Sequence, residues 1–255
     1  MANIFMFEKK KRKIQELEGK IRELESEIQD LLPRKSNFNK TIKYLDSDVA
    51  LYRDKVTKHQ ALLYIQKIIC NSIIYNDYAY TILRNPNAAP NLDLNDFLPT
   101  SESHNFEVKD VGNNLIYLPS DTTPFITFPW NNKRVIDDIF TIGKDARNPF
   151  DNASSNIDNI YIYPLGIVLV GASGNHSQLI GLLKGEMNSI RIDHIYNIST
   201  ALKETSDYQF SNFNGSRKYK DTDSIKDKWI SLMTVGRYLI DDPNFPPQIL
   251  SELKK

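Results

Sequence analysis

The sequence has little cysteine and no long uninterrupted hydrophobic segment. Cys70 is the single cysteine among 255 residues, so the chain forms no internal disulfide and offers no pair of thiolates to a metal. The longest apolar stretch, residues 160–170, is interrupted by Pro164 and Gly166 and is far shorter than the roughly 20 residues that a membrane helix needs. A charged run follows the apolar residues 1–7 directly, which is the reverse of a signal peptide. We therefore expect a cytoplasmic protein that does not associate with a membrane.

An excess charge of either sign is also missing. The 32 basic residues balance the 32 acidic ones, so any attraction to nucleic acid has to come from a local patch. Lys9–Lys13 and Arg217–Lys220 are two such patches, and the first is more simply explained as the solvated start of a helix. Hydrophobic residues make up 40% of the chain, which is enough for a packed core.

Residues 14–31 follow a heptad repeat that predicts a coiled coil. Isoleucine occupies every a position and leucine every d position: Ile14, Leu17, Ile21, Leu24, Ile28 and Leu31. This combination favours parallel two-stranded coiled coils. Lys13 and Lys20 at g positions would face the e positions of the partner helix, where Glu18 and Glu25 lie. We expect a homodimer through residues 14–31, the alternative being that the same stripe packs on the chain's own helices.

The remaining pattern predicts an α+β protein with four segments. Residues 1–84 form a helical arm, in which a second long helix runs from about residue 41 to 84. The second half of this helix is apolar around most of its circumference, so we expect it to be buried against the domain. Residues 85–103 form a linker with three prolines. A small mixed α/β domain occupies residues 104–200. A polar loop and a C-terminal helix occupy residues 201–255.

Within the last two segments, alternation and residue type predict individual elements. The predicted strands are Phe106–Val108, Leu115–Leu118, Ile160–Tyr163, Ile167–Val170 and Ile190–Ile198. The predicted helices are one from Pro129 to Phe140, one over Gln178–Lys184 and one over Trp229–Ile240, and the predicted polar loop covers residues 203–224.

A strand, a glycine-containing loop and a helix follow one another in the middle of this domain. Gly171 and Gly174 permit a positive φ and the close approach of a ligand. The helix start offers free N–H groups and the positive end of a dipole, which suit a phosphate. Asn175 or Ser177 can cap the helix, and His176 can donate to a phosphate or act as a general base. The alternative is a capped tight turn that binds nothing.

A cation to complete such a phosphate site has to come from another segment. Arg134, on the helix after Trp130, is the first candidate, followed by Lys133 and Arg147. Each of these three is equally well explained as a solvated surface charge. Trp130 can stack on a base or serve as a half-buried core aromatic.

Acidic groups near the loop are candidates for catalysis. Glu186 and Asp193 lie close in sequence to the His176 helix and can activate water or hold a metal. Asp193 and His194 alternate along a strand, so only one of them can face the site. Pairing His176 with either of them gives two metal ligands instead of the expected three or four, and we assign no metal site. The aspartates at 137–138 point in different directions on a helix and form no metal pair.

Two sequence boxes carry a resemblance to known proteins. Val-Gly-x-x-Gly-Asn-His-Ser at residues 170–177 is followed by a helix and by Ile-Arg-Ile-Asp-His-Ile at residues 190–195. This arrangement resembles the nucleotide-binding core of the ParB/sulfiredoxin superfamily, in which a strand ends in a Gly-x-x-Arg or Gly-x-His-Arg box that opens a helix. Residues 129–150 and 164–167 also resemble a family of uncharacterised bacterial proteins that carry the Gly-Asn-His-Ser box.

The resemblance covers roughly residues 105–200 and implies a small ParB-like α/β domain. It implies a phosphate of a nucleotide or nucleic acid at the loop, with a nucleotide or a divalent metal as the cofactor to test. Two departures limit it. Ser177-Gln178 replaces the arginine that follows the loop in that superfamily, and the reactive cysteine of sulfiredoxin is missing, so the resemblance does not imply its reductase activity.

Two functions follow as hypotheses. The first is a protein that binds the phosphate of a nucleotide or nucleic acid, as a nuclease or nucleotide hydrolase in DNA processing or in phage or plasmid biology. The second is a non-catalytic interaction module that uses its coiled coil to assemble a complex with a protein partner. A cleft that holds His176 beside Arg134 would favour the first, and a packed loop without a cleft would favour the second.

Overall fold

The computed structural model describes residues 12–13, 15–17, 19–20, 22, 55–75, 107–112, 114–204 and 222–255. The chain divides into two compact units, Met1–Asp54 and Lys55–Lys255. In the first unit the described residues are helical, and Lys20 Nζ lies 3.2 Å from Glu16 Oε1, one helical turn away. Leu17, at a predicted d position, is 49% exposed. The other apolar positions of the predicted coiled coil and the predicted linker at 85–103 lie outside the described residues.

The second unit mixes helices and strands, which confirms the α+β class. Its helices are α2 (Lys55–Ser72), α5 (Asn132–Thr141), α6 (Asn175–Leu183), α7 (Ser199–Glu204), α9 (Thr222–Leu239) and α10 (Pro247–Leu253). Its strands are β1 (Glu107–Asp110), β2 (Ile116–Pro119), β3 (Phe125–Ile126), β4 (Asn159–Tyr163), β5 (Ile167–Val170), β6 (Ser189–Ile192) and β7 (His194–Asn197).

The strands form two sheets. The larger has the order β1-β7-β4-β5-β3, and β2 pairs with β6 in a separate two-stranded sheet. Strand β5 pairs with β4 on one side, antiparallel, and with β3 on the other, parallel. All four residues of β5 are buried, as expected for a strand that is covered on both faces. The loop that leaves β5 therefore starts from a well-anchored position.

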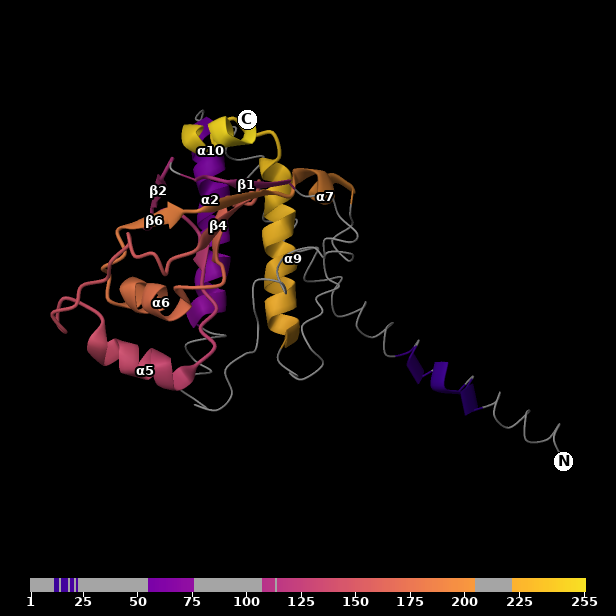
Figure 1. Cartoon of the computed structure of the whole chain (residues 1–255). Coiled ribbons are helices and arrows are strands. Elements are labelled where there is room, and N and C mark those ends of the chain that lie inside the picture. Colours follow the sequence, from indigo (N-terminus) through magenta and orange to yellow (C-terminus); the bar gives the residue numbers. More distant parts are fainter. Residues whose placement is uncertain are drawn as a thin grey trace. The chain divides into compact units, whose positions relative to one another are not determined.

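One face of the larger sheet packs against α2, α7 and α9. Ile160 and Ile162 of β4 share a buried cluster with Cys70 of α2 and Trp229 of α9. Figure 1 shows α2 and α9 side by side, with α5 and α6 together and away from that pair. None of the described helices is long and apolar enough to cross a membrane.

Helix α2 is buried or half-buried at most of its described positions and is exposed along one narrow strip. The positions that continue the a/d register of the N-terminal repeat are buried at His59, Gln66, Cys70 and Ile73. On another side of the helix, Tyr64 is 51% and Ile68 is 68% exposed. Between residues 58 and 75 only positions 60, 64, 68 and 75 are exposed, so this part of the chain packs against the domain over most of its circumference, as expected.

The segment expected to form one strand over Ile190–Ile198 forms two. Strand β6 pairs with β2, whereas β7 joins the larger sheet. At the junction, Asp193 donates its backbone N–H to the Asn159 carbonyl at 2.9 Å, and its Oδ2 accepts the Asn159 N–H at 3.0 Å. Alternation did not reveal this break, because the residues on both sides of it keep the same apolar pattern.

Both ends of the expected polar loop at 203–224 are helical. Helix α7 extends to Glu204, and α9 begins at Thr222, while residues 205–221 lie outside the described part of the chain. Strand β3, α7 and α10 are short elements that the sequence analysis did not predict, since two to seven residues carry too little periodicity.

We predict that Gln66→Leu destabilises the second unit. The fully buried amide of Gln66 donates to the carbonyls of Leu165 at 3.1 Å and Leu232 at 3.0 Å, so it joins α2 to α9 and to the turn after β4. Removing a buried donor leaves its acceptors unpaired and costs about 1–3 kcal/mol. Urea denaturation measures the change. The matched control is Gln60→Leu, on an exposed position of the same helix, and equal effects of the two substitutions would contradict the prediction.

Candidate functional site

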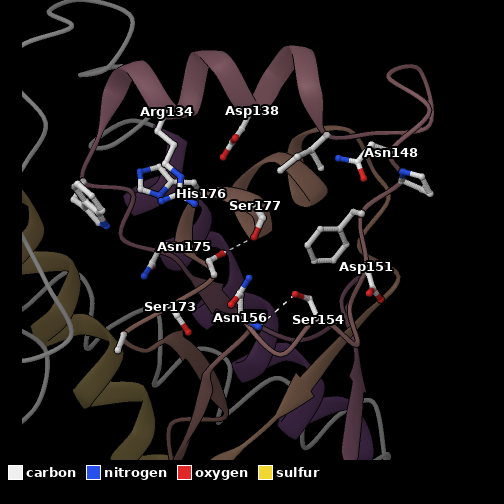
Figure 2. Close-up of a pocket in the computed structure, with 16 residues that line it drawn as sticks. Arg134, Asp138, Asn148, Asp151, Ser154, Asn156, Ser173, Asn175, His176 and Ser177 are labelled. Atoms are coloured by element: carbon white, nitrogen blue, oxygen red, sulfur yellow. Dashed lines mark hydrogen bonds between the residues drawn. The ribbon is translucent and has the colours of Figure 1, made fainter.

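A pocket of about 490 Å³ lies between α5, the start of α6 and the loop that precedes β4 (Figure 2). From the α5 side it is lined by residues four apart: Trp130, Arg134, Asp138 and Ile142. The loop contributes Asn148, Pro149, Phe150, Asp151, Ser154 and Asn156, and the α6 side contributes Ala172, Ser173, Gly174, Asn175, His176 and Ser177. The fold thus brings Trp130 and Arg134 to the loop that the sequence singled out.

Gly171 does not line this pocket, because an internal carboxylate occupies its surroundings. The Gly171 N–H donates to the Asp158 carbonyl at 2.7 Å, and the Ala172 N–H donates to Asp158 Oδ2 at 2.9 Å. A Cβ on Gly171 would lie 2.2 Å from Asp158 Oδ2. The expectation that Gly171 binds phosphate is therefore wrong. Its small size accommodates Asp158 instead.

The side chain of Asn175 is used to build the loop. Its Oδ1 accepts the Phe128 N–H at 2.7 Å and the Thr127 hydroxyl at 3.1 Å. Its Nδ2 donates to the Gly171 carbonyl at 3.0 Å. These bonds join the segment after β3, the end of β5 and the start of α6, so the side chain of Asn175 mainly serves to hold the loop in place.

The start of α6 carries no side-chain cap. Gly174 is the N-cap residue with φ +85°, in the left-handed region that glycine adopts without strain. A Cβ there would lie 2.9 Å from the Asn156 carbonyl. Neither Asn175 nor Ser177 caps the helix, contrary to expectation, and the Ser177 hydroxyl donates to the Gly174 carbonyl at 3.2 Å. The positive end of the helix dipole therefore faces the pocket without a side-chain acceptor.

His176 is a pocket residue whose imidazole is almost fully buried, with 5% of the residue exposed. Its Nε2 accepts the Asn131 N–H at 3.1 Å. Burial, together with the nearby Arg134 charge, lowers the pKa of His176 to about 4. At neutral pH the ring is therefore uncharged, with its proton on Nδ1. That N–H has no partner within the described residues and can donate to a ligand.

The residues on the α5 side surround this imidazole. The Trp130 ring lies edge-on to His176, with centroids 5.2 Å apart and an interplanar angle of 78°, and Trp130 is 59% exposed. Figure 2 shows Arg134 and Asp138 both pointing from α5 toward the start of α6. Burial raises the pKa of the Asp138 carboxyl, against the opposing effect of Arg134.

Glu186 and Asp193 do not reach the pocket. Glu186 accepts the N–H groups of Lys144 at 2.7 Å and Phe150 at 3.1 Å, and these bonds lower the pKa of its carboxyl. Asp193 accepts from Asn159 and from Arg191 Nε at 2.9 Å. Both carboxylates hold backbone segments in place, and the structure does not bring either to His176.

His194 lies elsewhere as well, between two carboxylates. Its Nδ1 is 2.6 Å from Asp110 Oδ1, and its Nε2 is 3.3 Å from Asp158 Oδ1. It therefore does not join His176 in a metal site. Across the described residues, no group of three or more His, Cys, Asp or Glu side chains is arranged to hold a metal ion.

The structure brings one of the three candidate cations to the pocket, and it adds a carboxylate that sequence reasoning missed. Arg134 lines the pocket, whereas Lys133 and Arg147 are exposed outside it. Asp138 was considered only as half of a metal pair. Its spacing of four from Arg134, and of eight from Trp130, was the signal that could have placed it on the same helix face.

A protein family described as a family of unknown function (DUF6710) matches residues 7–229. The matched region includes every residue that lines the pocket. No curated protein and no solved structure matches the chain. The function therefore has to be inferred from the chemistry of the pocket.

We predict that His176 makes the stability of the protein fall in mild acid. The pKa of His176 is about 4 in the folded chain against 6.5 for an ordinary histidine, so the unfolded chain binds more protons between these values. The free energy of unfolding should fall as the pH is lowered from 6.5 toward 4, by at most about 3 kcal/mol.

The comparison with His176→Gln isolates this contribution, because the glutamine oxygen can still accept the Asn131 N–H. The variant should show a shallower pH dependence of urea unfolding. An NMR titration of the wild-type imidazole should give a midpoint near pH 4, and a midpoint near 6.5 would contradict the prediction.

Proposed function

We propose that this chain, which belongs to the DUF6710 family, binds the phosphate group of a nucleotide or nucleic acid in the pocket at the start of α6. One observation carries the proposal. The uncapped start of α6, the Nδ1–H of the buried His176 and the guanidinium of Arg134 meet in a single pocket. All three groups favour an anion, and together they match the donors that proteins use for phosphate.

Arg134 is the charged member of this set. Its guanidinium makes no hydrogen bond or ion pair within the described residues, so its donors are available. Its charge reaches the imidazole, since it contributes to the lowered pKa of His176. A planar guanidinium can bind two phosphate oxygens at once. This residue supplies the positive charge that Ser177-Gln178 lacks.

The arrangement supports binding more than hydrolysis. A nuclease or nucleotide hydrolase needs a group that activates water, and His176 holds its proton on Nδ1 while Nε2 faces the Asn131 N–H. A neutral ring with a pKa near 4 is a weak base. We therefore propose His176 as a hydrogen-bond donor to the ligand and assign no catalytic base.

Two broader proposals accompany this one. We propose that the domain is ParB-like, on the resemblance of residues 170–177 to that superfamily. We also propose that the protein acts in the cytoplasm. Its single thiol, Cys70, is buried and forms no disulfide, and burial raises the pKa of that thiol. A buried thiol of high pKa does not form disulfides readily.

A second function concerns the N-terminal unit. We propose that residues 14–31 pair with a second copy of the chain and so assemble a complex, with or without a further protein partner. Leu17 supports this proposal, because a leucine at a d position that is 49% exposed in the single chain is available for a partner helix. The helical backbone at residues 12–13, 15–17, 19–20 and 22 agrees with the register.

We predict that Arg134→Gln weakens the binding of inorganic phosphate and of nucleotides by about 10- to 100-fold, the effect of losing charge-assisted hydrogen bonds. Isothermal titration calorimetry measures the dissociation constants. The matched control is Lys133→Gln, which removes a positive charge from the neighbouring exposed residue outside the pocket. If both variants lose affinity equally, the attraction is a general surface effect and the site is wrong.

We predict that Leu17→Glu dissociates the proposed dimer and so lowers its molar mass in solution. A charge at a d position would have to be buried in the coiled coil, which is unfavourable. Size-exclusion chromatography with light scattering measures the mass. Gln15→Glu adds the same charge two residues away and should leave the mass unchanged. Deleting residues 1–33 should likewise give one chain per particle, and a wild-type number of chains per particle in both variants would refute the dimer.

A further inference from the structure

We propose that the pocket is selective for a small phosphate monoester whose body carries hydroxyl groups, and that Asp138 is the residue that recognises those hydroxyls. Sugar phosphates and nucleoside monophosphates share this chemistry. The inference rests on the proposed function, since it assumes that the phosphate lies at the start of α6. It goes further by naming the rest of the ligand and by excluding polyanions.

The size of the pocket requires more than a phosphate ion. A volume of about 490 Å³ lies within the range of small-molecule sites, about 300–1,000 Å³. The pocket extends from His176 and Arg134, on the left in Figure 2, to the loop that carries Asn148 and Asp151, on the right. A phosphate bound at the first end leaves the second end to the body of the ligand.

The charged residues of the lining limit the charge of the ligand. Arg134 is the single cation among the lining residues, whereas Asp138 and Asp151 are two carboxylates. With His176 neutral, the lining carries one positive and two negative charges. A polyphosphate or a nucleic-acid strand would bring several negative charges against these carboxylates. A single phosphate at the helix start is paired with Arg134 and brings less negative charge to the pocket than a polyanion does.

The other polar groups select hydroxyls over ammonium groups. Asn156, Ser154 and Ser173 line the pocket, and amides and hydroxyls both donate and accept hydrogen bonds. A ligand hydroxyl also does both, whereas an ammonium group only donates. Asp138 makes no side-chain hydrogen bond within the described residues, and Figure 2 shows its carboxylate pointing into the pocket. It is therefore free to accept from a ligand hydroxyl.

His176 supplies the observation that separates this site from an ordinary helix start. His176 is buried, with 5% of the residue exposed, and it lines the pocket. Its Nδ1–H lacks a partner within the described residues. The ring is fixed by its bond from the Asn131 N–H, and the Nδ1–H remains as an open hydrogen-bond donor. A bound phosphate oxygen would satisfy it.

The test compares the affinities of ribose 5-phosphate and inorganic phosphate, measured by isothermal titration calorimetry. For the wild type we expect ribose 5-phosphate to bind about tenfold more tightly, the effect of one hydrogen bond to a charged group. Asp138→Asn should abolish most of this preference without weakening inorganic phosphate. Asp137→Asn, an exposed neighbour outside the pocket, should keep the preference. Circular dichroism and thermal unfolding confirm that both variants fold.

Several outcomes overturn the inference. An unchanged preference in Asp138→Asn, or tighter binding of tripolyphosphate or a short oligothymidylate than of ribose 5-phosphate, would do so while leaving phosphate binding intact. Failure of the proposed function looks different, since no phosphate compound would then bind the wild type in a manner sensitive to Arg134→Gln.

The source of the monoester is read from a further pair of ligands. If adenosine monophosphate binds more tightly than ribose 5-phosphate, and Trp130→Leu removes this difference in affinity, the ligand is a nucleotide whose base stacks on the exposed indole. Equal affinities identify a sugar phosphate. Either result supports the inference, because both ligands carry the hydroxyls that Asp138 is proposed to bind.

Discussion

The buried side chain of Asn175 joins three segments on which the pocket depends. Its Oδ1 accepts from the Phe128 N–H and the Thr127 hydroxyl, and its Nδ2 donates to the Gly171 carbonyl. The chain therefore leaves β5 and enters α6 in one defined path, so that His176 is held against Trp130. Because a buried amide that loses its partners costs about 1–3 kcal/mol for each unpaired group, this junction is well determined before any ligand arrives.

An internal carboxylate and the proposed phosphate site lie on either side of this junction. The Asp158 carboxylate accepts the N–H of Ala172 and fills the space beside Gly171. The first turn of the loop therefore already has an anionic partner inside the protein. The start of α6, one turn later, has no such partner. We propose that an external anion binds there, beside His176 and Arg134, where the lowered pKa of the imidazole keeps the ring a neutral donor.

Local pattern predicted the elements around the site, and tertiary contacts decided the roles of their residues. The strand Ile167–Val170 was predicted with its observed bounds, because four consecutive apolar residues suit a strand buried on both faces. The role of Gly171 was not predictable, since it depends on Asp158, which lies thirteen residues earlier in the chain. Asn175 was assigned to a ligand for the same reason, because its partners come from a distant strand. The break at Asp193 likewise depends on contacts that alternation does not encode.

The central claim is that a phosphate group binds at the start of α6, and a crystal structure of the full chain grown with inorganic phosphate tests it most directly. The account predicts one phosphate in the pocket, with an oxygen within hydrogen-bond distance of His176 Nδ1 and another within reach of the Arg134 guanidinium. Phosphate bound only elsewhere, for instance at Arg217–Lys220, with the pocket holding none at a saturating concentration, would contradict it.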